Sequence, residues 1–72
     1  MSIAIRLRRA RERAGLTRRD VDRAIGAADS GHTGKIERGE RKRLQYETVQ
    51  ALARALGVTV EWLMGTGERR AS

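Results

Sequence analysis

The chain has 72 residues, the length of one small domain, and at this size only about 60% of the unfolded surface can be buried on folding. It contains one Trp, one Tyr and no Phe, Pro or Cys. This composition disfavours a β-sheet and excludes disulfides and thiolate metal sites. Sixteen Lys and Arg against nine Asp and Glu give a formal net charge of +7, so a polyanion is the expected partner.

The residues that would support export, membrane insertion or catalysis are missing from the sequence. Charge enters by Arg6, so the first residues are expected to form neither a signal peptide nor a membrane span. A soluble protein of the reducing cytoplasm is therefore expected. His32 is the single histidine and has no partner at metal-ligand spacing. With no catalytic triad and no phosphate-binding glycine loop, we expect no enzyme, no cofactor, no metal and no small-molecule effector.

The first helix is predicted from residue 3, with Ser2 as its N-cap, to Ala14, with Gly15 as its terminal glycine. One face carries apolar residues at helical spacing: Ile3, Leu7, Ala10 and Ala14. Arg11 falls on the same face. A guanidinium directed at a core needs a carboxylate partner, because an unpaired buried charge is costly. Glu37 is the expected partner. The neighbouring basic residues are expected to form a solvated face: Arg6, Arg8, Arg9 and Arg13.

The second helix has a clear start signal in the sequence. Thr17 is its N-cap, Asp20 completes a capping box three residues later, and Leu16 can pack against Val21. The helix should end near Gly26. Its inner face is predicted to hold Val21, Ala24 and Ile25. Its outer face is predicted to hold Arg18, Arg19, Asp22 and Arg23.

A third helix is predicted from Asp29, as N-cap, to Arg38, with Gly39 as its terminal glycine. Ile36 is its one strong core residue. Gly31 and Gly34 each cost about 1 kcal/mol relative to Ala in a helix interior. This helix is therefore weak by its own propensity and depends on packing or on a ligand.

The remaining elements are a basic loop over residues 40–45 and two further helices. The fourth helix, from Tyr46 to Leu56, has its apolar face at Tyr46, Val49, Leu52, Ala53 and Leu56. A short fifth helix follows the cap Thr59 and carries Trp62 and Leu63 before Gly65. The predicted fold class is all-α, a compact bundle of five short helices. Residues 1–65 form the domain, and residues 66–72 form a flexible tail.

Three segments in this order resemble a known family: LRRARERAGLTRRDV, KIERG and LARALGVTVEWLMGTG. Together they resemble the DNA-binding domain of Cro/cI-type phage repressors and of the large bacterial regulator family named after the xenobiotic response element. The resemblance spans about residues 3–65. It implies a lambda-repressor-like five-helix domain with a helix-turn-helix, the third helix in the major groove, and a homodimer on two half-sites.

The resemblance also implies roles for individual residues. Arg11 and Glu37 match the family's buried ion pair. Base reading would fall to residues of the third helix: Ser30, Gly31, His32 and Lys35, of which Lys35 can donate to guanine O6 and N7. Phosphate contacts would come from the start of the second helix and from the basic loop: Thr17, Arg18, Arg19, Arg41, Lys42 and Arg43. Dimer contacts are expected at Val58, Trp62 and Leu63.

Two features depart from the family pattern. The turn GAAD is one residue longer than usual, which leaves the register of the third helix open by one residue. Thr33 then occupies a position where the family normally buries Ile or Val.

The predicted function is sequence-specific binding of double-stranded DNA by a bacterial or phage transcriptional regulator at the nucleoid, a repressor rather than an activator. The operator is expected to be palindromic, with half-sites one helical turn, about 34 Å, apart. The alternative is an antitoxin or protein-interaction module that uses the same fold.

Overall fold

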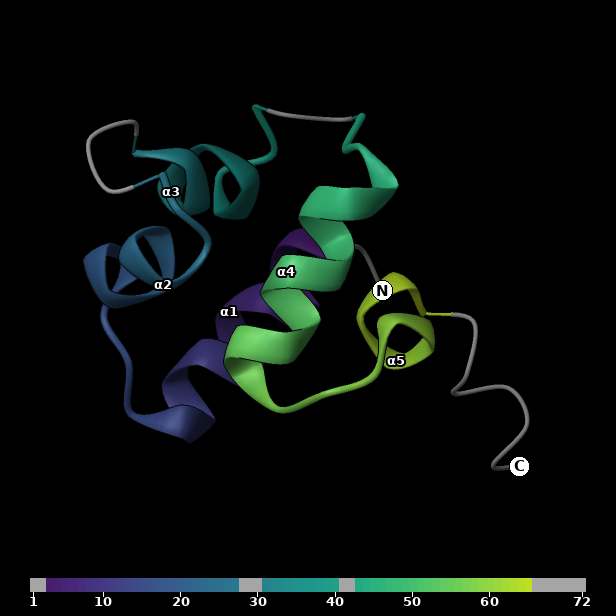
Figure 1. Cartoon of the computed structure of the whole chain (residues 1–72), viewed down its shortest axis with the longest axis horizontal. Coiled ribbons are helices and arrows are strands. Elements are labelled where there is room, and N and C mark those ends of the chain that lie inside the picture. The colour runs from purple at the N-terminus through teal and green to yellow at the C-terminus, as the bar shows by residue number, and fades with distance from the viewer. Residues whose placement is uncertain (1–2, 28–30, 41–42, 66–72) are drawn as a thin grey trace.

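Five helices form the described part of the chain, residues 3–27, 31–40 and 43–65 of the computed structural model. They are α1 (Ile3–Ala14), α2 (Arg18–Ala24), α3 (His32–Glu37), α4 (Tyr46–Leu56) and α5 (Val60–Met64). Figure 1 shows α1 behind α4, with α2 and α3 on one side of this pair and α5 on the other. The predicted all-α architecture is confirmed. None of the helices in these ranges has the length and apolar character needed to cross a membrane.

The core lies between α1 and α4 and receives residues from every helix. Its fully buried aliphatic side chains are Leu7, Val21, Ile36, Leu52 and Leu63. Burying such a side chain contributes about 1.5–3 kcal/mol each. Leu16, Val58 and Trp62 pack against this cluster while keeping some exposure. The apolar spacing of the first and fourth helices therefore identified most of the core correctly.

The predicted start of α2 is also confirmed. Thr17 Oγ1 accepts a hydrogen bond from Asp20 N at 3.0 Å, and Thr17 N donates to Asp20 Oδ2 at 2.9 Å. This reciprocal pair is the predicted capping box. The N-cap of α5 is also a threonine, because Thr59 Oγ1 accepts a hydrogen bond from Trp62 N at 3.0 Å.

Several residues lie on a different face from the one predicted. Ala14, Ala24 and Tyr46 are exposed, whereas Asp22 and Arg6 are buried. Ala14 and Tyr46 are terminal residues of their helices, where packing ends. In α2, the buried side includes Val21 and Asp22, so the helix is turned about its axis relative to the predicted apolar face.

Arg6 was predicted on the solvated face of the first helix, and this prediction was wrong. Its Nη1 donates to the backbone oxygen of Trp62 at 3.2 Å. Its guanidinium carbon also lies 5.3 Å from the centre of the Trp62 ring, within range of a cation–π contact. Arg6 therefore links α1 to α5.

The third helix begins later than predicted. It starts at His32, and its N-cap is Gly31, whose backbone is left-handed with φ 64°. Glycine adopts this conformation without the steric penalty that other residues pay. The predicted N-cap, Asp29, lies outside the described residues. At the other end, α3 stops at Glu37 and the left-handed Gly39 follows, with φ 77°, close to the predicted end.

Candidate nucleic-acid interface

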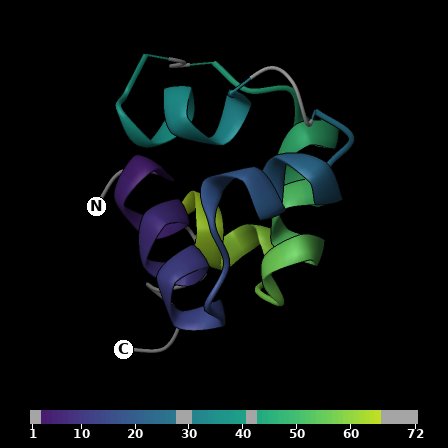
Figure 2. The same cartoon turned by 90° about the vertical axis from the view of Figure 1, so that its left-hand side faces the viewer.

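The two sides of α3 differ in exposure. Gly31, Lys35 and Arg38 are exposed on one side, whereas Thr33, Ile36 and the side chain of Glu37 face the rest of the protein. Figure 2 shows α3 lying across the other helices at one edge of the molecule, with α2 beneath it. The helix therefore offers a basic outer surface, and its inner side fixes its orientation.

Asp22 of α2 anchors the beginning of α3. The Asp22 side chain is buried, and its Oδ1 accepts hydrogen bonds from Thr33 N at 2.7 Å and from Thr33 Oγ1 at 2.5 Å. The N-cap residue of α3, Gly31, supplies no side-chain cap of its own. Asp22 therefore caps α3 from the neighbouring helix, where a carboxylate also interacts favourably with the helix dipole. The hydrogen-bonded pair of Asp22 and Thr33 therefore occupies the position where the resemblance led us to expect a buried Ile or Val.

Glu37 anchors the end of α3. Its carboxylate accepts from Arg11 Nε at 2.7 Å and from Arg11 Nη2 at 3.3 Å, and its side chain is only 2% exposed. The expected ion pair is thus present. The hydrogen bond to Glu37 is the main cause that raises the pKa of Arg11 above its usual value. Arg11 Nη1 also donates to the backbone oxygen of Leu16 at 2.9 Å, which ties the end of α1 to the turn before α2.

The same carboxylate holds a second arginine. Arg18, at the start of α2, donates from Nε to Glu37 Oε1 at 3.0 Å, while its side chain remains 52% exposed. Glu37 therefore joins α1, α2 and α3. The contact also places the start of α2 directly beside the second half of α3.

The start of α2 exposes three residues expected to contact phosphate: Thr17, Arg18 and Arg19. The capping box uses the Thr17 backbone amide, so Thr17 retains only its hydroxyl proton for a ligand. The backbone hydrogen bond from Thr17, followed by the bond to its side chain, lowers the pKa of Asp20. Asp20 is thus ionised at neutral pH next to the two exposed arginines.

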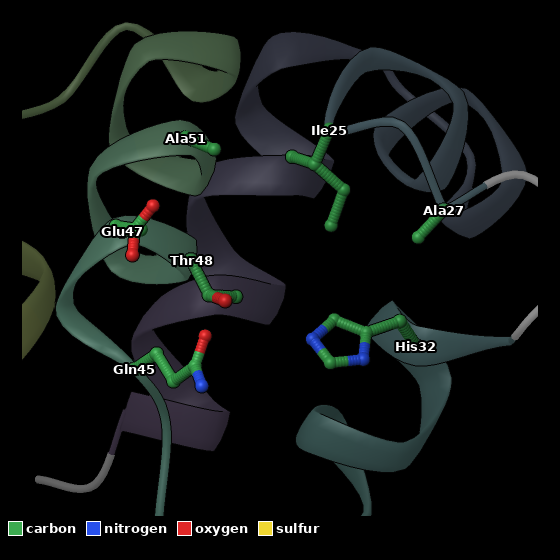
Figure 3. Close-up of a pocket in the computed structure, with 7 residues that line it drawn as sticks. All are labelled: Ile25, Ala27, His32, Gln45, Glu47, Thr48 and Ala51. Atoms are coloured by element: carbon green, nitrogen blue, oxygen red, sulfur yellow. The ribbon is translucent and has the colours of Figure 1, made fainter.

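A pocket of about 350 Å³ lies between the turn after α2, the first residue of α3 and the start of α4. Its lining residues are Ile25, Ala27, His32, Gln45, Glu47, Thr48 and Ala51. Figure 3 shows the His32 ring directed across this pocket toward Gln45 and Thr48. His32 is half-buried and lies on the flank of α3, beside the exposed side that carries Lys35 and Arg38.

The other predicted site residues are placed as follows. Arg43 is exposed, and Figure 1 shows the segment that leads into α4 at the same end of the molecule as α3. Ser30, Arg41 and Lys42 lie outside the described residues. Leu63 has no exposed surface, so its predicted role as a dimer contact is wrong for this conformation. Among residues 3–27, 31–40 and 43–65 there is no cluster of three potential metal ligands.

Sequence reasoning missed Asp22 as the buried anchor of α3 and Arg38 as part of the exposed side of this helix. Asp22 was assigned to the outer face because charged residues are usually exposed. The signal that could have identified it is Thr33, because a hydroxyl at a core position requires a hydrogen-bond partner. Arg38 gave no comparable signal, since its surroundings depend on how α2 packs against α3.

The fold and this pair of helices define the protein class: α2 and α3 follow one another in the chain, are held together by polar contacts, and form a helix-turn-helix. A family model described as a helix-turn-helix domain matches residues 2–63. The chain belongs to this family and is a helix-turn-helix DNA-binding domain. No curated protein and no solved structure shows a significant match to the chain.

Proposed function

We propose that the protein binds double-stranded DNA sequence-specifically as a transcriptional regulator of the Cro/cI type, acting as a repressor. The observation that carries this proposal is the two-sidedness of α3. Asp22 and Glu37 fix its inner side, while its outer side exposes Lys35. Arg18 and Arg19 of α2 are also exposed, and Glu37 holds Arg18 against the end of α3. A rigidly held helix with a basic outer surface suits insertion into the major groove.

The proposed contacts divide into two kinds. Arg18, Arg19 and Arg43, together with Arg41 and Lys42, would contact phosphates, which supplies affinity and orientation without sequence preference. Thr17 would add its hydroxyl. Lys35 would read guanine through O6 and N7. Ser30 and Gly31, which precede α3 in the sequence, would make further contacts with base edges. His32, on the flank of α3, would contribute less to base reading.

Two substitutions test this division. Lys35→Ala should reduce binding to the selected operator by about tenfold, or about 1.4 kcal/mol, and leave binding to random duplex little changed. Arg43→Ala should weaken operator and random duplex equally and reduce the salt slope by about 0.9. The operator is identified by selecting bound duplexes from a random pool. Affinities are then measured by gel shifts at several salt concentrations. Equal losses on both duplexes for both variants would refute the division.

The same gel shifts address the alternative that the domain is an antitoxin or protein-interaction module. DNA binding predicts a discrete shifted species whose affinity falls with salt by a slope of about −0.9 per phosphate contacted. A protein-only module predicts no discrete shifted species at any salt concentration. In that case the proposed function is wrong.

The proposed assembly is a homodimer on a palindromic operator, with α5 at the dimer surface. Val58 and Trp62 are half-buried and Met64 is exposed, so α5 and the loop before it retain apolar surface. Sedimentation with and without operator tests this assembly. A complex with one protein chain per palindromic duplex would contradict it.

A further inference from the structure

Gly34 lies in the middle of α3 and is covered by two arginine side chains. A Cβ atom built on Gly34 would be 3.1 Å from Nη1 of Arg38 and 3.6 Å from Cδ of Arg18. Arg38 follows the last turn of α3, and Arg18 begins α2. The Arg38 guanidinium and the aliphatic part of the Arg18 side chain therefore lie over Gly34, the one residue of α3 that has no side chain.

Each of these arginines is oriented by a carboxylate. Arg18 donates from Nε to Glu37 at 3.0 Å, and Arg38 donates from Nε to Glu40 at 2.7 Å. The hydrogen bond from Arg38 lowers the pKa of Glu40, so this carboxylate stays ionised at neutral pH. Both contacts use the inner Nε atom. The arginine side chains remain 52% and 56% exposed, and Nη1 of Arg38 lies over Gly34.

The charge at this position favours an anion. Glu37 is shared between Arg18 and the partly buried Arg11, so its single negative charge faces two guanidiniums. Glu40 offsets Arg38, and the exposed Lys35 adds a further positive charge one turn before Arg38 on the same side of α3. The planar fork of arginine presents paired N–H donors that match phosphate oxygens.

We propose that Arg18 and Arg38 form a clamp for one phosphate group of the DNA backbone, and that Gly34 provides the space in which the Arg38 guanidinium packs against α3 beside the Arg18 side chain. This inference rests on the proposed DNA binding and adds Arg38 and Gly34 to the interface. Two guanidiniums fixed at Nε lose less freedom on binding than mobile side chains do. The clamp would then set the position of α3 along the duplex without reading sequence.

Gly34 makes the clamp testable, because stability and binding should change in opposite directions. Glycine is a poor helix former and alanine the best, so Gly34→Ala should leave the melting temperature equal to or above that of the wild type. The added Cβ would meet Arg38 Nη1 at 3.1 Å and displace the end of that side chain. Binding to duplex DNA should nevertheless weaken several-fold.

The experiment is a double-mutant cycle measured on a fluorescently labelled duplex of mixed sequence at several salt concentrations. Arg38→Ala should weaken binding about tenfold, as expected for loss of a charged hydrogen-bonded contact, and reduce the salt slope by about 0.9. Gly34→Ala should have no further effect in the Arg38→Ala background. Arg54→Ala is the matched control, because Arg54 is exposed on α4 and its removal changes the net charge equally.

The outcomes separate the clamp from the function on which it rests. If the wild type binds duplex with a clear salt slope and Arg38→Ala behaves like Arg54→Ala, the clamp is wrong and DNA binding stands. Additive losses from Gly34→Ala and Arg38→Ala would likewise overturn the role of Gly34. If the wild type binds no duplex at any salt concentration, both the clamp and the proposed function are wrong.

Discussion

The bundle of α1, α4 and α5 and the helix α3 are held in place by different kinds of contact. In the bundle, each helix contributes a fully buried leucine to one apolar cluster: Leu7 from α1, Leu52 from α4 and Leu63 from α5. α3 contributes one aliphatic side chain to the core, Ile36. Its other anchors are the hydrogen bonds of Thr33 to Asp22 and the ion pairs of Glu37 with Arg11 and Arg18.

This difference affects how the orientation of α3 is fixed. Apolar burial is non-directional, so it stabilises the bundle without fixing the rotation of any one helix. Hydrogen bonds to a buried carboxylate are directional. α3 has six residues, far fewer than the roughly 12–15 that an isolated helix needs for marginal stability. Its position is therefore set by Asp22 at its beginning and Glu37 at its end.

The largest effect is expected from Glu37→Gln, which removes the charge shared by Arg11 and Arg18. Removing one partner of a buried pair leaves the other uncompensated, and we expect a loss of about 3 kcal/mol in unfolding free energy. Arg11 is more deeply buried than Arg18, so the loss of its partner accounts for most of this decrease in stability. Urea unfolding measures the loss. Glu47→Gln, at an exposed position of α4, is the matched control and should change stability little.

A smaller and more local effect is expected from Asp22→Ala. It leaves two buried Thr33 donors without their acceptor, which should cost about 2 kcal/mol. Amide hydrogen exchange should become faster in α3 than in α4. Leu52→Ala, by contrast, should accelerate exchange throughout the molecule, because it opens the shared core.

The double variant Asp22→Ala with Thr33→Val sharpens this prediction. Replacing both hydrogen-bonding partners by apolar groups is far less costly than removing one. The double variant should therefore recover most of the stability lost by Asp22→Ala alone. If the two losses simply add, the Asp22–Thr33 contact does not anchor α3.

The smallest effect concerns acid and the capping box. Because folding lowers the pKa of Asp20, its contribution is fully present above the unfolded value, about 3.9, and is lost as pH falls through the lower folded value. An NMR titration should show the Asp20 carboxylate titrating below its ordinary range, and Thr17→Ala should raise that pKa toward normal. An ordinary pKa in the wild type would contradict the capping-box explanation.

The sequence predicted what depends on local signals. The cap of α2 was predicted because Thr17 and Asp20 carry the whole signal within four residues. The partner of Arg11 was predictable over a long separation, because a guanidinium on an apolar face demands a carboxylate.

The remaining features depend on contacts between helices. The burial of Asp22 and Arg6 could not be predicted from a rule that places charged residues outside. The start of α3 was misplaced because its cap comes from α2 rather than from the residue before it. The meeting of Arg18 and Arg38 over Gly34 follows from how α2 packs against α3, which no local pattern encodes.

The most direct test of the whole account is an NMR titration of the isotopically labelled protein with duplex DNA. Amide shifts and protection from exchange should concentrate at four residues, Arg18, Arg19, Lys35 and Arg38, with α5 unaffected apart from any dimer contact. Changes centred on the pocket around His32 and Thr48, or no change in α3 while the duplex binds, would contradict it.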